Sequence, residues 1–214
     1  MSTQTDDMTT RLIGLTLELR CADGTSTEFR QTNEERIRKT LRSLVTPHLL
    51  AESELVLASE NRVNTMPCRS IDIILARTSA RAPLIFPLIF PAGLLDISEV
   101  QDDSPGGNST IYEDRAGAGT ARLSPLVSYL EIHTAGGWGI VLRVLAMVRG
   151  TGDDRRQPSA QLCSLPIVPF RLLEGGIGLI NPNNITRVST RPIPGALPET
   201  ALPMDLRRWT PLRF

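Results

Sequence analysis

Basic side chains are the residues of this 214-residue chain whose types and spacing suggest chemistry most directly. Four of them fall in one predicted helix: Arg36, Arg38, Lys39 and Arg42. Two more precede an aromatic residue near the C-terminus, in the sequence Arg207-Arg208-Trp209. Guanidinium and ammonium groups neutralise phosphates, and a neighbouring ring can stack on a base. These six cations are therefore candidate nucleic-acid-binding residues.

The charge balance and the small number of rings weigh against nucleic-acid binding. The chain has 23 Lys and Arg against 23 Asp and Glu, so no long-range field draws a polyanion to it. Glu34 and Glu35 open the same helix, and aromatic residues make up 4% of the chain, whereas stacking surfaces need more rings. A solvated helix face is the simpler interpretation, and a nucleic-acid or small-ligand binding module built on the paired β-subdomains stands as the alternative.

Histidines and cysteines lack the spacing of a metal site. The chain has two histidines, and its three cysteines, Cys21, Cys68 and Cys163, are widely separated with no Cys-x-x-Cys pair. It also lacks the Gly-x-Ser-x-Gly sequence of a hydrolase nucleophile, and the glycine-rich residues 175–178 lack the Lys-Ser/Thr of a phosphate-binding loop. We therefore predict no enzymatic activity, no metal and no cofactor.

Two apolar segments are candidate contact surfaces for another protein or a second copy of this chain. Residues 83–91 read PLIFPLIFP, whose prolines exclude a helix and favour an extended edge. An apolar edge is either buried in its own fold or paired with another subunit. The C-terminal arm also carries rings that need burial, in its own chain or in a neighbour. The predicted interface residues are Leu84, Phe86, Leu88, Phe90, Trp209 and Phe214.

Local patterns predict the elements that would position these side chains. Residues 12–20 alternate, Asp23-Gly24 supplies a turn and residues 25–30 return, which predicts a hairpin. Thr32 and Glu35 have the spacing of a capping box before a short helix that ends at Pro47. Residues 54–58 and 62–66 predict a strand pair. Residues 70–77 predict a strand buried on one face, and residues 140–148 a central strand buried on both.

An internal duplication is predicted from two pairs of similar segments. Leu17-Glu18-Leu19, followed by Gly24, resembles Leu130-Glu131-Ile132, followed by Gly137. Residues 41–63 align with residues 162–185 after one gap, which matches Leu55 with Ile177 and Leu57 with Leu179. Self-similarity of this kind is the sequence signature of repeated structural units.

These observations predict a mainly β, β-rich α+β protein with two small barrel-like or sandwich-like subdomains. The predicted parts are a disordered leader (1–10), a first repeat (11–100), a linker (101–125), a second repeat (126–190) and an extended proline-rich arm (191–214). The longest apolar run, residues 82–97, is too short to span a bilayer, and no secretory signal is evident. We expect a cytoplasmic, non-enzymatic subunit of a homo-oligomer or larger assembly.

Overall fold

The computed structural model describes residues 14–46, 48–58, 62–78, 94–100, 123–149 and 162–191. Its first strands and helix are β1 (Leu15–Cys21), β2 (Ser26–Gln31), α1 (Glu34–Leu44), the 3₁₀ turn η1 (Leu49–Ala51), β3 (Glu54–Ala58), β4 (Val63–Pro67), the 3₁₀ turn η2 (Cys68–Ser70) and β5 (Ile71–Thr78). The later elements are β6 (Leu94–Glu99), β7 (Leu123–Thr134), β8 (Gly139–Arg149), β9 (Val168–Arg171), β10 (Gly176–Ile180), the 3₁₀ turn η4 (Pro182–Asn184) and β11 (Ile185–Arg191).

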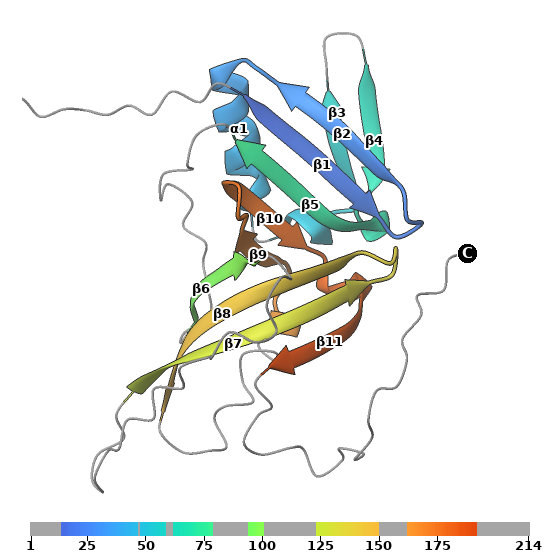
Figure 1. The fold of residues 1–214 in the computed structure, drawn as a ribbon. Helices are drawn as coiled ribbons and strands as arrows, with labels where there is room; N and C mark the ends of the chain where they lie inside the picture. The colour runs from blue at the N-terminus through green and yellow to red at the C-terminus, as the bar shows by residue number, and fades with distance from the viewer. Residues whose placement is uncertain are drawn as a thin grey trace, which may run out of the picture.

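Most described strands belong to one nine-stranded sheet, which confirms the predicted β-rich class. Its order is β11-β7-β8-β6-β9-β10-β5-β1-β2, and β3 and β4 form a separate two-stranded sheet (Figure 1). β10 pairs with β5, and β6 pairs with β8, so strands of the two predicted repeats are hydrogen-bonded to each other. β7 begins at Leu123, inside the segment 101–125 that was predicted to be a linker.

Two apolar cores lie on the sheet and meet at β5. The first core joins β1 and β5 to α1, whose Ile37, Leu41 and Leu44 are buried. The second core joins β7 and β8 to β9. β5 contributes Ile74 to the first core and Ile73 to the second.

The observed burial of β5 and β8 is therefore the reverse of the predicted burial. β5, predicted to be buried on one face, is buried on both, because each face meets a different core. β8, predicted to be buried on both faces, alternates between buried and half-buried positions from Ile140 to Ala146. Its apolar residues on the second face are only partly covered.

The predicted short helix is present, but a different residue caps it. The N-cap is Asn33, whose Oδ1 accepts a hydrogen bond of 3.0 Å from the amide of Arg36, and not Thr32. Asn and Ser or Thr are comparable caps, so the sequence pattern alone was ambiguous by one position. Glu34 and Glu35 then stand in the first turn, where carboxylates favour the helix dipole.

The turns of the β1–β2 and β7–β8 hairpins have the same backbone hydrogen bonds. In the first, the amide of Cys21 donates to the carbonyl of Thr25, and the carbonyl of Cys21 accepts from the amide of Gly24. In the second, the amide of Thr134 donates to the carbonyl of Trp138, and the carbonyl of Thr134 accepts from the amide of Gly137. The two glycines have φ angles of 81° and 78°, a left-handed conformation that disfavours other residues.

A second pair of matching hydrogen bonds ties each turn to the 3₁₀ turn before the next strand. Ala22 donates to the carbonyl of Ser70, at the end of η2, and Ala135 donates to that of Asn184, at the end of η4; both distances are 2.9 Å. β5 then pairs with β1, and β11 with β7, and each pairing has a register shift next to the turn. The aligned Leu55 and Ile177, by contrast, lie in β3, the first strand of its hairpin, and in β10, the second strand of its hairpin.

Candidate functional site

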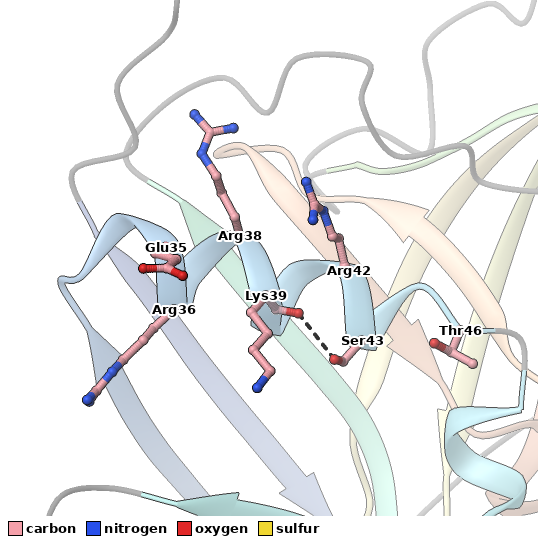
Figure 2. A pocket seen from close by; sticks show the side chains of 7 residues that line it. All are labelled: Glu35, Arg36, Arg38, Lys39, Arg42, Ser43 and Thr46. Carbon is pink, nitrogen blue, oxygen red and sulfur yellow. Dashed lines mark hydrogen bonds between the residues drawn. The ribbon is translucent and has the colours of Figure 1, made fainter.

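The predicted basic residues of the helix lie on the exposed side of α1. Burial of its apolar face against the first core leaves Arg36, Lys39 and Arg42 exposed. Figure 2 shows that Arg38 and Arg42 point to one side of the helix, whereas Arg36 and Lys39 point to the other. The four cations therefore spread along a surface and do not converge on one point.

A shallow hollow of 730 Å³ lies on this basic helix face. The lining residues are Glu35, Arg36, Arg38, Lys39, Arg42, Ser43 and Thr46 (Figure 2). None of them is aromatic, so this part of the surface offers cations for phosphates and no ring on which a base could stack. The arrangement suits an extended polyanion better than a single anion.

Acidic neighbours reduce the positive charge of the basic helix face. Arg38 forms an ion pair of 2.7 Å with Glu34, one helical turn away, and Glu35 lines the same hollow. The remaining exposed cations are Arg36, Lys39 and Arg42. Exposed pairs of this kind contribute little to stability and are weakened by salt.

A buried polar junction, which the sequence analysis missed, joins the two hairpin turns. The side chain of Asp72 is fully buried; its Oδ2 accepts a hydrogen bond of 2.7 Å from the amide of Gly136, and its Oδ1 has no hydrogen-bond partner among the described residues. The indole nitrogen of Trp138 donates to the carbonyl of Cys21 at 2.9 Å. The guanidinium of Arg20 lies 5.1 Å from the centre of that indole ring. No local pattern signals this junction, because each contact joins residues far apart in the sequence.

The described cysteines are poorly suited to nucleophilic chemistry. Burial raises the pKa of the Cys21 thiol, and the carboxylates of Asp23 and Asp72 raise it further. Burial also raises the pKa of Cys68, and partial desolvation raises the pKa of Cys163, although that residue is exposed overall. A raised pKa keeps each thiol protonated at neutral pH, and the protonated thiol is the unreactive form.

The other predicted site residues lie outside the described part of the chain. They are Leu84, Phe86, Leu88, Phe90, Arg207, Arg208, Trp209 and Phe214. Within the described ranges, no group of three or more His, Cys, Asp or Glu side chains is placed to hold a metal ion. No helix in those ranges has the length and apolar character needed to cross a membrane.

Comparison of the chain with family models, with curated proteins and with solved structures found no match. Function is therefore inferred from the residues and their geometry.

Proposed function

We propose that this chain is a non-enzymatic interaction protein that acts as a subunit of a homo-oligomer or of a larger assembly. The observation that carries the proposal is the β3–β4 hairpin, which is paired with no strand of the nine-stranded sheet. One face of this hairpin packs on the first core, whereas the outer edge of β4 is unpaired among the described strands. An unpaired strand edge can accept a strand of a protein partner.

The outer face of the hairpin is exposed and carries apolar side chains among polar ones. Val56 lies opposite Thr65, and Ala58 lies opposite Val63. Val56 is 53% exposed and Val63 is 65% exposed, and both rank among the few large apolar side chains so exposed in the described residues. Two such side chains on one small sheet favour a docking surface over an ordinary solvent face.

We also propose that the chain arose by duplication of one unit. Support comes from the matching turns of the two hairpins and from the matching bonds from Ala22 to Ser70 and from Ala135 to Asn184. In this proposal β1, β2, β3, β4 and β5 correspond to β7, β8, β9, β10 and β11. The 3₁₀ turns η2 and η4 occupy the same place before the last strand of each unit. This correspondence replaces the alignment of Leu55 with Ile177.

The apolar segment 83–91 and the C-terminal arm remain proposed contact surfaces on the strength of their sequence. Trp209 and Phe214 are aromatic residues, and aromatic side chains contribute strongly to binding when an interface buries them. Deletion of residues 207–214 is expected to lower the assembly state or the stability of the assembly. A truncated chain with unchanged mass distribution and unchanged melting temperature would exclude the arm from the interface.

A nucleic-acid-binding role is the second candidate, and the basic helix face favours it. Replacement of Arg36, Lys39 and Arg42 by Glu should weaken binding to a single-stranded oligonucleotide and reduce the salt slope of log K by about 2–3. Arg30→Glu is the matched control, because the side chain of Arg30 is 79% exposed on β2 and does not line the hollow. An assembly protein without this activity should show no salt-dependent binding in either variant.

Native mass spectrometry of the full chain tests the main proposal. Species at multiples of 23.5 kDa that persist on dilution to low micromolar concentration would support it. A chain that remains monomeric at every concentration and binds no protein partner would overturn it. A monomer with bound oligonucleotide mass would shift the conclusion to the second candidate.

A further inference from the structure

The pairing of β10 with β5, called the internal joint below, shows how one unit of the chain docks on the other. β10 pairs antiparallel with β5, with Ile177 opposite Ala76 and Leu179 opposite Ile74. The hairpin β9–β10 thus adds two strands to the edge of the β1–β2–β5 sheet. Its one face contributes Phe170 and Ile180 to the second core, and its other face contributes Ile177 and Leu179 to the first. It is buried on both faces because it lies between two units.

The β3–β4 hairpin packs one of its faces on a core, and its other face is not covered by any described element. Leu55 is buried in the first core, and Leu57 and Met66 pack against that core, as Phe170 and Ile180 pack in the second. The opposite face, with Val56 and Val63, is exposed. It corresponds to the face of β9–β10 that carries Ile177 and Leu179, so one docking hairpin of the chain is occupied and the other is vacant among the described strands.

The receiving edge is also present a second time. β11 follows η4 as β5 follows η2, and β11 pairs with β7 as β5 pairs with β1. Val188 packs against the second core, as Ile74 is buried in the first. β5 receives β10 on its free side, whereas β11 is the last strand of the described sheet. Among the described strands, none pairs with the acceptor edge of the second unit, whereas β10 pairs with its counterpart in the first.

We propose that β4 of one molecule pairs antiparallel with β11 of a second copy of this chain; the proposal rests on the assembly function and the duplication proposed above. Figure 1 shows β3 and β4 near β1 and β2 at one end of the molecule and β11 at the other, with β10, β8 and β7 between them. One chain cannot bring these strands together without unfolding its sheet. The contact is head-to-tail, so it generates a ring or a filament.

The internal joint fixes the expected register. Cys68 starts η2 as Pro182 starts η4, so Met66 corresponds to Ile180 and Thr65 to Leu179. Carrying the β10–β5 pairing across to β4 and β11 gives four expected pairs: Met66 with Arg187, Thr65 with Val188, Asn64 with Ser189, and Val63 with Thr190.

The new face is more polar than the internal joint. Arg187 and Ser189, joined by a hydrogen bond of 2.7 Å, correspond to the fully or almost fully buried Ile73 and Leu75 of β5. A polar contact of this kind lets each chain fold before it assembles, whereas the apolar internal joint must form during folding. Backbone pairing would supply affinity, and the exposed apolar side chain of Val63 on β4 would supply specificity.

Disulfide trapping between two singly substituted proteins tests both the contact and its register. The background is Cys163→Ser, since Cys163 is exposed whereas Cys21 and Cys68 are buried. Asn64→Cys in one protein and Ser189→Cys in the other should give a disulfide-linked dimer on mild oxidation of an equimolar mixture. Paired positions in adjacent antiparallel strands lie within disulfide reach. One chain carrying both substitutions should give a ladder of multimers or a closed covalent ring.

Thr190→Cys is the matched control for register. It lies one residue further along β11 and faces the opposite side of the strand, so it should not trap Asn64→Cys. Trapping of Asn64→Cys by Ser189→Cys at a yield at least about tenfold above that control supports the proposal. Equal yields for both mixtures, or no trapping in either, would overturn it.

A second pair of variants separates the failure of this contact from the failure of assembly. Val63→Arg should weaken self-association at least about tenfold, because a charge replaces an apolar side chain in the interface. Leu173→Arg is the control, since Leu173 is 58% exposed in the turn after β9 and outside the expected contact. An oligomeric wild type that Val63→Arg leaves unchanged would refute the β4–β11 contact alone. A monomeric wild type would refute assembly itself.

Discussion

Gly136 is the position at which one added methyl group should disrupt the buried polar junction. A Cβ at this residue would overlap the carbonyl oxygen of Cys21 and lie 2.8 Å from the indole nitrogen of Trp138. It would also lie 2.9 Å from Oδ2 of Asp72. Backbone atoms cannot yield as a flexible side-chain end can, so the two hairpin turns must move apart.

The expected cost follows from the hydrogen bonds that this movement breaks. The bond from Gly136 to Asp72 involves a carboxylate, and such bonds contribute about 1.5–3 kcal/mol, while the neutral bond from Trp138 to Cys21 contributes about 0.5–1.5 kcal/mol. Because bonds in one network do not add fully, we expect Gly136→Ala to lower the free energy of unfolding by about 2–4 kcal/mol.

Urea denaturation followed by circular dichroism measures this loss, with Gly139→Ala as the matched control. A Cβ at Gly139 meets its nearest neighbour, the ring of His133, at an ordinary 3.6 Å. The control should therefore stay within about 0.5 kcal/mol of wild type. If Gly136→Ala also stays within about 0.5 kcal/mol at an unchanged denaturant slope, the junction does not stabilise the fold and the reasoning is wrong.

Three further substitutions test the charges, packing and capping of the described fold. Burial opposes ionisation of Glu18, but two arginines outweigh it and lower its pKa below the ordinary 4.5. Its carboxylate thus stabilises the fold above that pH, and the contribution is lost as pH falls through the lower pKa of the folded state. Glu18→Gln should therefore flatten the acid limb, which is the fall in the free energy of unfolding as the pH decreases. Gly178→Ala should cost at least about 2 kcal/mol, because its Cβ would overlap the buried ring of Phe170. Asn33→Ala should cost about 1 kcal/mol through loss of the helix cap.

Each of these substitutions has a control in the same chain. Glu28→Gln should change the acid limb less than Glu18→Gln, because the Glu28–Arg30 pair is exposed to solvent. Combining Gly178→Ala with Phe170→Leu should cost less than the sum of the two single changes, since the smaller side chain relieves the overlap; an additive result would contradict the packing argument. Thr32→Ala should leave stability unchanged, and a loss equal to that of Asn33→Ala would contradict the observed cap.

Local patterns predicted the elements that depend on neighbouring residues. Alternation from residue 12 and the Asp23-Gly24 turn gave β1 and β2, and the helical spacing of Ile37, Leu41 and Leu44 gave α1. The strand pair β3–β4 was predicted within a residue of its observed bounds. In each case hydrophobic periodicity and turn chemistry act over a few residues, so the sequence contains the information directly.

The features that could not be predicted depend on contacts between segments far apart in the sequence. Burial of β5 on both faces depends on two cores built from distant segments, and the junction at Asp72 depends on Gly136; no local pattern marks either feature. The segment alignment that matched Leu55 with Ile177 rested on shared Leu, Pro, Glu and Asn residues, which recur in many strand and turn segments. The basic cluster of α1 was visible in sequence, but the opposite directions of its side chains and the Arg38–Glu34 pair required coordinates.

The position of β5 between two cores also has a consequence during synthesis. The ribosome completes β5 at Thr78, but the strand that covers its free edge, β10, is complete only at Ile180. At about 5–20 residues per second, the intervening stretch of about 100 residues takes about 5–20 s to emerge. During that interval the nascent chain presents an unpaired edge flanked by Ile73 and Leu75, which is the kind of surface that chaperones shield and that aggregates in crowded polysomes. Slowing translation after residue 78 should therefore lower the soluble yield of this protein, although its final structure is unchanged.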